Sequence, residues 1–358
     1  PVGDAVRADL TVTFTAPKQA NVLPPASHFG GSLVVADIGS PPALLDHSPS
    51  KLFLTEEADA RAWLEATRYA PDSYKNTHGH ALVVAGSRGM TGAAALCGNA
   101  AMGAGAGLVT VATPLSALAG VTARLMPEVM TAPLPETERG SIGDGAHAHV
   151  SKLSERATVV AIGCGLSHDS EETRRFVREA VEGRAVPFII DADGLNALAP
   201  WPAELRGTRE APIILTPHEG EMRRLVGSRE GAAFGDRARL VSDFAAEHQL
   251  VVVLKGTRTM IAAPDGRVFV NPTGNPGLGT AGSGDTLTGI ITAFNAQAFA
   301  TLKTEADPLA ATVAAVYVGG LAGDLAARAE GLRSLVASDI REHLGAAIRA
   351  LDAKGEQP

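Results

Sequence analysis

The sequence predicts an α/β fold, in which a mostly parallel central sheet is covered by helices on both faces. Two observations support this fold class. From about residue 80 onward, short runs of Val, Ile and Leu alternate with segments whose apolar residues recur at helical spacing. The short runs are almost continuously apolar, as are strands buried on both faces of a parallel sheet. Alternation of strands and helices indicates crossover helices that form a layer on each side of the sheet.

The central strands and the helices between them follow directly from this pattern. The expected strands are His80–Ala85, Leu108–Ala112, Val159–Ile162, Phe188–Ile190, Ile213–Leu215 and Val251–Leu254. The expected helices between them are Gly92–Ala106, Glu171–Glu182, Glu219–Val226 and Phe234–His248.

A hairpin and further helices are expected after the last of these strands. Thr259–Ala262 and Val268–Asn271 flank the turn-forming tripeptide Pro264-Asp265-Gly266, which predicts a hairpin. Another helix is expected from Leu287, where apolar residues recur at helical spacing. The chain closes with two Ala-rich segments that suit closely packed helices, Pro308–Ala329 and Ser338–Leu351.

The first 45 residues lie outside this alternation. Leu10–Phe14 and Leu33–Asp37 are strand-like, and the proline-containing segment Pro17–Pro25 lies between them. An ordinary N-terminal hairpin is one interpretation of these two short strands.

Length and composition limit the class of protein. The chain has 358 residues, enough for one large α/β core, although length alone would allow two domains. Aromatic residues make up only 4%, so the core must be built from Ala, Val, Leu and Ile. A net charge of −8 argues against a general surface for nucleic acid or anionic membranes. We find no continuous apolar run that could span a bilayer and no signal-peptide pattern, so a soluble cytoplasmic protein is expected.

The cysteines and histidines indicate neither a disulfide framework nor a zinc site. Cys97 and Cys164 are the only cysteines, and their apolar surroundings predict buried, inert thiols. His147 and His149 flank Ala148 but have no cysteine companions.

The glycine-rich segment Asn275–Gly289 is the most informative feature of the chain. It leads into a helix N-terminus, where unpaired backbone N–H groups and the positive end of the helix dipole can bind a phosphate. Asp285 lies beside this site, although a carboxylate repels phosphate. A base that takes a proton from a hydroxyl attacking that phosphate would account for the position. The alternative is that Asp285 only caps the helix.

Small, polar or ionisable residues follow five of the expected strands. In an open parallel sheet, ligands bind beyond the carboxyl ends of the strands. The five segments at that edge are Gly86–Ala94, Gly163–Leu166, Asp191–Asn196, Thr216–Glu221 and Lys255–Thr259.

Each ionisable residue at this edge also has a simpler explanation. Asp193 could cap a helix that extends through Leu198. His218 could start the next helix by contacting its backbone, and Lys255 could be a solvated strand end.

Two glycine-rich segments do not match common nucleotide motifs. Gly86–Gly92 is not a Walker loop, because Ala93 stands where the lysine is needed. Gly103–Gly107 precedes a strand, whereas a dinucleotide fingerprint follows one. Close packing of a helix on the sheet is the expected role of Gly103–Gly107.

Together these segments resemble the ADP/ATP-dependent NAD(P)H-hydrate dehydratases over roughly residues 75–350. The stretch Gly282-Ser283-Gly284-Asp285 is similar to the anion-hole and base motif of the ribokinase-like superfamily. The other segments that carry the resemblance, in family order, are Lys75–His80, Gly86-Ser87, Gly92–Ala94, Gly105–Val109, Asp191–Asn196, Thr216–Glu221, Lys255-Gly256 and Asn275–Gly289. The resemblance implies a ribokinase-like three-layer α/β/α sandwich, with a dehydratase domain at residues 50–355. Cys164 is a departure, since a proline is commoner there, and it should affect loop stiffness more than chemistry.

The N-terminal segment carries a second resemblance. Thr13-Phe14, Lys18, Gly30-Gly31 and Val35–Gly39 resemble the end of an NAD(P)H-hydrate epimerase domain, which precedes the dehydratase in many bacterial fusion proteins. Residues 1–45 are therefore expected to be the C-terminal remnant of such a domain, in a truncated fusion protein.

The resemblance implies a metabolite-repair lyase. It would convert the S epimer of hydrated NADH or NADPH (NADHX or NADPHX) back to the reduced coenzyme. The reaction would consume ADP, which yields AMP and phosphate. Eukaryotic members use ATP instead. The implied residues for the hydrated dinucleotide are Ala93, Gly165, His218 and Asp285. Those implied for the adenine nucleotide are Lys255, Gly256, Thr257, Arg258, Thr259, Gly282, Ser283 and Gly284.

Asp285 would activate the ring hydroxyl for phosphorylation, after which the ring nitrogen expels phosphate. Mg²⁺ is expected, held largely by nucleotide phosphates and water, with no protein ligand assigned. The expected partners are these small molecules, without nucleic acid or membrane, and the chain is expected to form a homo-oligomer such as a tetramer.

Two other functions remain open from the sequence. A ribokinase-like kinase for a sugar, thiazole or vitamin would share the fold and the Asp, and fold analogy does not separate it from a dehydratase. A catalytically silent nucleotide-binding module is the other alternative, against which the intact Asp285 and glycine-rich segment count.

Overall fold

A ten-stranded sheet forms the centre of the protein in a computed structural model that describes residues 4–46, 48–168, 170–227 and 236–352. The strand order is β3-β12-β11-β10-β9-β8-β7-β4-β5-β6. Neighbouring strands are parallel except in the pairs β10–β11 and β11–β12. The strands are β3 (Leu52–Leu54), β4 (His80–Val84), β5 (Leu108–Pro114), β6 (Met130–Leu134), β7 (Val159–Ile162), β8 (Phe188–Ile190), β9 (Ile213–Leu215), β10 (Val251–Leu254), β11 (Met260–Ala262) and β12 (Val268–Val270).

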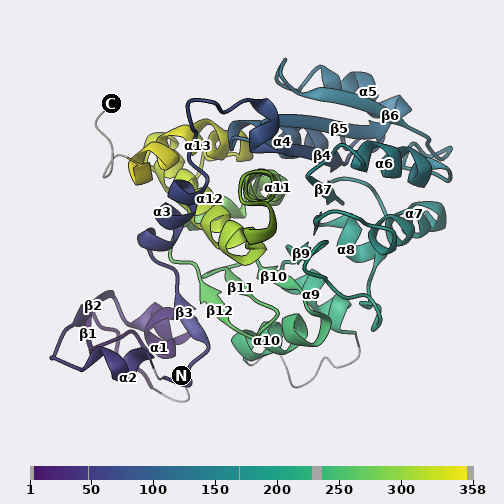
Figure 1. Cartoon of the computed structure of the whole chain (residues 1–358). Helices are drawn as coiled ribbons and strands as arrows, with labels where there is room; N and C mark the ends of the chain where they lie inside the picture. Colours follow the sequence, from purple (N-terminus) through teal and green to yellow (C-terminus); the bar gives the residue numbers. More distant parts are fainter. Residues whose placement is uncertain (1–3, 47, 169, 228–235, 353–358) are drawn as a thin grey trace.

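Helices cover both faces of this sheet, which gives the three layers that the sequence predicts (Figure 1). One layer consists of α3 (Glu57–Ala66), α4 (Thr91–Gly103), α5 (Leu115–Thr122), α11 (Ser283–Thr301), α12 (Pro308–Glu330) and α13 (Ala337–Asp352). The other consists of α6 (Ala146–Ser154), α7 (Glu171–Glu182), α8 (Asp193–Ala197), α9 (Glu219–Val226) and α10 (Arg237–His248). Short 3₁₀ helices lie at η2 (Lys75–His78), η3 (Pro276–Gly279) and η4 (Lys303–Glu305).

The apolar side chains of the central strands contribute to the hydrophobic cores on both faces of the sheet. In β4, Ala81 and Val83 belong to the core beneath α4 and α11, whereas Leu82 and Val84 belong to the opposite core. Successive strand residues point to opposite faces, so a strand buried on both sides must be apolar throughout. The continuous Val, Ile and Leu pattern is therefore a direct consequence of the three-layer arrangement.

Most of the predicted elements are confirmed, with small shifts at their ends. Strands β7, β8, β9 and β10 and helices α7 and α9 have the expected bounds. The hairpin is also confirmed, because β11 and β12 pair in antiparallel fashion around Pro264-Asp265-Gly266. Helix α10 begins at Arg237 within the described residues; the expected start at Phe234 lies outside them.

Edge elements were not predicted from the sequence. Strand β6 has the sequence MTAPL, and its Pro133 has no N–H group to donate to a neighbouring strand. A proline is tolerated here because β6 lies at the edge of the sheet. Strand β3 has only three residues and lies at the other edge. Both were missed because short edge strands lack the long apolar run of a buried strand.

Residues 4–46, here called the N-terminal unit, lie beside β3 and outside the main sheet (Figure 1). The unit contains β1 (Leu10–Phe14), α1 (Gln19–Val22), η1 (Ala26–Phe29), β2 (Ser32–Ala36) and α2 (Pro42–Asp46). Strands β1 and β2 pair in parallel, so the hairpin interpretation is wrong. The intervening helices carry the chain back to the start of the first strand, which parallel pairing requires.

Helix α12 is long and apolar, with a mean hydropathy of 1.6 over 18 residues, so by length and composition it could cross a membrane. However, 78% of that window is buried inside the protein, as expected for a core helix. Two of its small residues approach the start of α11 closely: Gly319 lies against Leu287 and Ile290 of α11, and Gly320 lies against Thr273 in the preceding loop.

Candidate active site

The carboxyl ends of β7, β8 and β10 and the first turns of α11 meet in one cluster of side chains. Asp191 follows β8, Lys255 follows β10 and Cys164 lies just beyond β7. Thr288 on α11 donates a hydrogen bond to Asp191 across the 2.8 Å between Oγ1 and Oδ2. The sheet edge therefore carries a polar centre where the sequence predicts a ligand site.

Asp191 and Lys255 form a largely buried ion pair at this centre. The Lys255 Nζ atom lies 2.7 Å from Asp191 Oδ1, and the side chains are 19% and 2% exposed. Burial opposes both charges, but the ion pair outweighs it, so the pKa of Asp191 is lowered and that of Lys255 is raised. The interpretation of Lys255 as a solvated strand end is wrong.

Asp285 lies in the first turn of α11 and does not cap this helix. The N-cap is Gly282, whose φ of 84° lies in the left-handed region that glycine adopts readily, and no side chain caps the helix. The Ser283 hydroxyl donates to the carbonyl oxygen of Thr280, which closes the preceding turn. Asp285 is left facing the cluster, since ligand atoms of Cys164, Asp191 and Asp285 lie within 4.8 Å of one another.

The environment of Asp285 favours its neutral form. Burial, followed by the negative charge of Asp191, raises the pKa of Asp285 to about 6, although a hydrogen bond with Cys164 and the charge of Lys255 oppose this shift. A carboxylate with this pKa is ionised near neutral pH but holds a proton more strongly than an exposed Asp. Both properties suit a general base.

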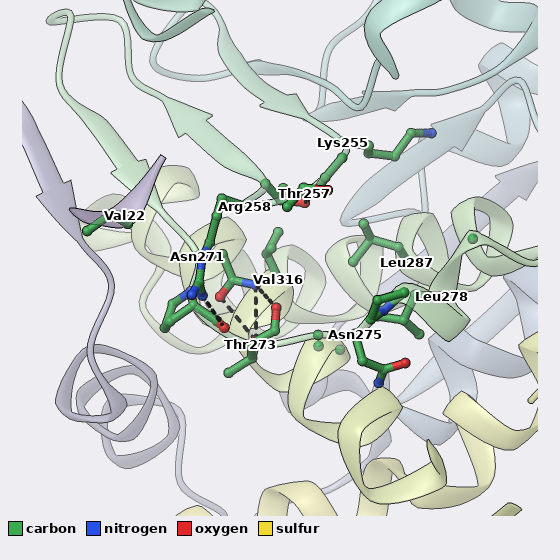
Figure 2. Close-up of a pocket in the computed structure, with 18 of the residues that line it drawn as sticks. Val22, Lys255, Thr257, Arg258, Asn271, Thr273, Asn275, Leu278, Leu287 and Val316 are labelled. Carbon is green, nitrogen blue, oxygen red and sulfur yellow. Dashed lines mark hydrogen bonds between the residues drawn. The ribbon is translucent and has the colours of Figure 1, made fainter. Parts of the chain in front are cut away.

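A cavity of 720 Å³ extends from this cluster along the glycine-rich segment (Figure 2). Lys255 and Arg258 line it, and the described residues around it include no Asp or Glu. In a protein of net charge −8, a positively charged cavity without acids indicates an anionic ligand. The lining combines predicted nucleotide residues with the loop before α11 and with residues of α11, α12 and α13: Lys255–Thr259, Asn271–Pro276, Leu278, Gly279, Ser283, Gly284, Leu287, Ile290, Val316, Gly319, Gly320 and Ile340.

Asp324 on α12 fixes the glycine-rich loop in place. Its carboxylate accepts hydrogen bonds from the Gly274 N–H and the Asn275 amide, each at 2.9 Å. Thr273 donates to the Tyr317 carbonyl oxygen at 2.9 Å. A Cβ at Gly320 would overlap Thr273, so glycine is needed for this close approach.

The structure separates the predicted nucleotide residues into two groups. Seven of them, Lys255 to Thr259 with Ser283 and Gly284, line the cavity. Gly282, the eighth predicted nucleotide residue, is not among its lining residues and comes directly before Ser283 in the chain. The predicted base, Asp285, is not a lining residue either and comes directly after Gly284. A Cβ at Gly284 would lie 3.3 Å from Lys255 Nζ, so the ammonium group adjoins the start of α11.

The predicted dinucleotide residues lie outside this cavity. A Cβ on Gly165 would come 2.8 Å from the Ala93 Cβ, so these two residues adjoin, and Gly165 follows Cys164 of the cluster. His218 forms an isolated bridge to Lys255. It also caps α9, because its Nδ1 accepts the Glu221 N–H at 3.2 Å, as its structural interpretation predicts.

Asp193 does not have the capping role considered for it. It is the first residue of α8, and no side chain caps that helix. Its Oδ1 lies 2.7 Å from His168 Nδ1, and its Oδ2 accepts the Ser167 N–H at 2.9 Å. Asp193 therefore holds the loop after Gly165.

Sequence reasoning did not assign roles to Asp191 and Thr288. Asp191 comes directly after a buried strand, and Thr288 follows Asp285 by one helical turn, so both positions were visible. What was missing was the crossing of α11 over β8, a long-range contact that no local pattern encodes.

Of the cluster Cys164–Asp191–Asp285, only part is available to bind a metal ion. Both Asp191 oxygens already accept hydrogen bonds, from Lys255 and Thr288. A hydrogen bond with Cys97 and burial raise the pKa of the Cys164 thiol, which stays neutral and is a poor ligand for a hard cation. Among the described residues, this leaves the Asp285 carboxylate as the group of this cluster that fits Mg²⁺.

Comparison with known proteins agrees with this geometry. The sequence model of a family described as NAD(P)H-hydrate dehydratase matches residues 81–345. A bifunctional NAD(P)H-hydrate repair enzyme Nnr of Moorella thermoacetica is 42% identical over 99% of this chain, and the chain spans 64% of that relative's length. An ADP-dependent (S)-NAD(P)H-hydrate dehydratase of Xanthomonas campestris is 35% identical over 76% of this chain and 88% of its own length.

Solved structures show the same similarity. A Bacillus subtilis ADP/ATP-dependent NAD(P)H-hydrate dehydratase, co-crystallised with ATP and Mg²⁺, matches with a TM-score of 0.70 and 32% identity. The match covers 84% of this chain and 98% of that one. A ribokinase-like superfamily protein from Enterococcus faecalis matches with a TM-score of 0.67, 25% identity and coverage of 85% and 98%.

Proposed function

Because this chain belongs to the NAD(P)H-hydrate dehydratase family, we propose that it repairs hydrated NADH and NADPH at the expense of ADP. The substrate is the S epimer of the hydrate, and the products are the reduced coenzyme, AMP and phosphate. One observation carries the proposal: a carboxylate with a pKa raised to about 6 lies where an acid-free, cationic cavity meets a helix N-terminus.

The proposed reaction has two stages. Asp285 takes the proton of the ring hydroxyl as the hydroxyl oxygen attacks the terminal phosphorus of ADP and AMP leaves. Phosphorylation turns hydroxide, a poor leaving group, into phosphate. The lone pair of the ring nitrogen then expels phosphate, and loss of a proton from the adjacent ring carbon restores the dihydronicotinamide.

The nucleotide half of the site acts by positioning and by stabilising charge. Lys255 and the N–H groups at Ser283 and Gly284 lie where they can bind the transferred phosphoryl group. The ion pair with Asp191 holds the Lys255 ammonium beside Gly284. Asp285 follows Gly284 directly in the chain, which supports a position for the base beside the phosphoryl group.

Mg²⁺ is proposed to bind mainly through the nucleotide phosphates and water. When bound, it neutralises phosphate charge during transfer. Asp285 is the carboxylate of the Cys164–Asp191–Asp285 cluster that remains available to such an ion.

Ala93, Gly165 and His218, which lie outside the lining of the cavity, are proposed to receive the hydrated dinucleotide. Their support is positional: Gly165 adjoins Cys164 of the cluster, and His218 bridges to Lys255. The half-exposed His218 ring, 55% accessible, can still contact a ligand while Nδ1 caps α9.

The finer organisation of the protein is also a proposal. Residues 50–355 would be the dehydratase domain, and residues 1–45 would be the end of an epimerase domain. The relative with that bifunctional name aligns over 99% of this chain, whereas the dehydratase of Xanthomonas campestris aligns over 76%. A homo-oligomer and a cytoplasmic location remain expectations.

The test is incubation of the purified chain with S-NADHX or S-NADPHX and either ADP or ATP. Recovery of reduced-nicotinamide absorbance, faster with ADP, is expected. Protein that binds ADP but restores no absorbance with either nucleotide would contradict the proposal. The rival, a small-molecule kinase, would instead leave a stable phosphate ester.

A further inference from the structure

The cavity has a second wall that comes from the N-terminal unit. The residues of this wall are Asn21, Val22, Ser27, His28, Gly31 and Leu33. None of them lies in the part of the chain that matches the dehydratase family, residues 81–345. The wall therefore lies outside the part of the chain that the dehydratase family model covers.

Buried contacts hold this wall against the main body. Val22 and Leu23 are only 9% and 7% exposed and belong to the same core cluster as Val270, and Leu52 and Leu54 of the edge strand β3 pack against this cluster. The anchored segment thus faces the cavity from a packed position.

The backbone of the second half of the wall is also fixed. Thr11 donates a hydrogen bond to the Gly30 carbonyl oxygen at 2.6 Å, and Leu33 pairs with Thr11 in the β1–β2 ladder. Gly31 has a φ of 60°, and a Cβ there would overlap the Asp9 carbonyl oxygen. These contacts leave the wall preorganised.

Val22 of this wall lies away from the proposed phosphate-binding groups. In Figure 2, Val22 lies beyond Arg258, on the far side from Lys255. Phosphates held at Lys255 and Gly284 leave the nucleoside to extend toward Arg258 and the N-terminal unit. Apolar Val22 and Leu33, together with polar Asn21, Ser27 and His28, suit a flat heteroaromatic ring with polar edges.

We propose that residues 21–33 form part of the adenine nucleotide site and contact the nucleoside half of ADP. The identity of the nucleotide rests on the proposed function. The N-terminal unit would thus set nucleotide affinity in the dehydratase half of the chain, a role separate from any epimerase chemistry.

The test compares two tryptophan substitutions within the same unit. Ser27→Trp places a large ring in the cavity, whereas Ser32→Trp places it on the exposed β2 strand, outside the cavity lining. Titration calorimetry with ADP, without any hydrated coenzyme, measures binding alone. We expect Ser27→Trp to raise the ADP Kd by about tenfold or more, with Ser32→Trp unchanged.

Inorganic pyrophosphate serves as a second probe, because it fills only the phosphate end. Its Kd should be the same in Ser27→Trp and the wild type, with equal melting temperatures showing that both are folded. Unchanged ADP binding in folded Ser27→Trp would overturn the inference, as would equal weakening of ADP and pyrophosphate. If Ser27→Trp weakens only ADP binding but the wild-type protein restores no NADH from the hydrate, the proposed function is contradicted and this inference stands.

Discussion

At the scale of single residues, Asp285 combines a position beside the proposed phosphate-binding groups with a raised affinity for a proton. Asp285→Asn keeps the shape but removes the base. Turnover should fall by about 10²–10⁴-fold, the usual contribution of a positioned general base. ADP binding should hold or tighten, because the substitution removes a negative charge that repels the phosphates. Steady-state kinetics and calorimetry measure the two effects.

The same substitution should stabilise the fold above pH 6. The folded-state pKa of Asp285, about 6, lies above its ordinary value of 3.8. Its contribution to stability is therefore full below the unfolded pKa and is lost as pH rises through the folded pKa. At pH 8 the variant should melt roughly a few degrees higher than the wild type. Near-normal turnover in a folded variant would remove Asp285 from the mechanism.

The pH profile gives an independent view of this carboxylate. If ionised Asp285 is the base, kcat/KM should fall on the acid side with an apparent pKa near 6. At one pH unit below that value, kcat/KM should be about tenfold lower than its plateau. Initial rates across the acid range test this. A profile that stays flat down to pH 5 would exclude a base with this pKa.

Asp191 is predicted to act through its neighbours. Asp191→Asn removes the partner of Lys255 and one of the negative charges that raise the pKa of Asp285. The acid limb of kcat/KM should therefore move to lower pH, while displacement of the Lys255 ammonium lowers kcat/KM on the order of tenfold to a hundredfold. Asp144→Asn, which breaks only an exposed pair with Arg175, is the control and should change neither. If the acid limb of kcat/KM stays at the same pH in a folded Asp191→Asn variant, the charge of Asp191 does not control the pKa of Asp285, and the prediction is wrong.

At the scale of the elements, helix α11, which carries the proposed base, depends on a close contact with α4. A Cβ at Gly289 would overlap the Cys97 carbonyl oxygen, so α11 approaches α4 across this glycine. Gly289→Ala should lower the free energy of unfolding by about 1–3 kcal/mol through overpacking. Gly92→Ala on α4, with no atom within 4 Å of its added Cβ, should be neutral or slightly stabilising. Chemical denaturation of both variants measures the difference, and equal stability would contradict the contact.

The elements also show what sequence patterns can and cannot reveal. Strands β7 to β10 and helices α7 and α9 were predictable because burial on both faces, or on one helical stripe, leaves a clear periodic pattern. The parallel pairing of β1 and β2 was not, because strand patterns carry no direction. Edge strands β3 and β6 have too few buried positions for such a pattern.

In the candidate site, too, local motifs could be predicted from the sequence and long-range contacts could not. The glycine-rich loop and Asp285 were visible as a local motif before a helix. The ion pair between Asp191 and Lys255 joins residues 64 positions apart, so only the assembled sheet brings them together. The wall formed by residues 21–33 likewise depends on packing of the N-terminal unit against β3, which composition does not encode.

At the scale of the whole molecule, two kinds of chemistry meet at one edge of the sheet. The cationic cavity is lined by Ser283 and Gly284, which directly precede Asp285, and Ala93, Gly165 and His218 are proposed to bind the substrate outside this lining. A phosphoryl donor in the cavity and a hydroxyl acceptor bound outside it would meet at the proposed base. This arrangement serves either a dehydratase or a kinase, and the fate of the phosphate distinguishes them.

The most direct test is therefore a product balance with S-NADHX and ADP. The account predicts one NADH, one AMP and one inorganic phosphate for each hydrate consumed, with no phosphorylated coenzyme accumulating at the end of the reaction. Absorbance follows NADH, and chromatography with a phosphate assay follows the rest. A stable phosphate ester without recovery of NADH would contradict the account and assign the site to a kinase.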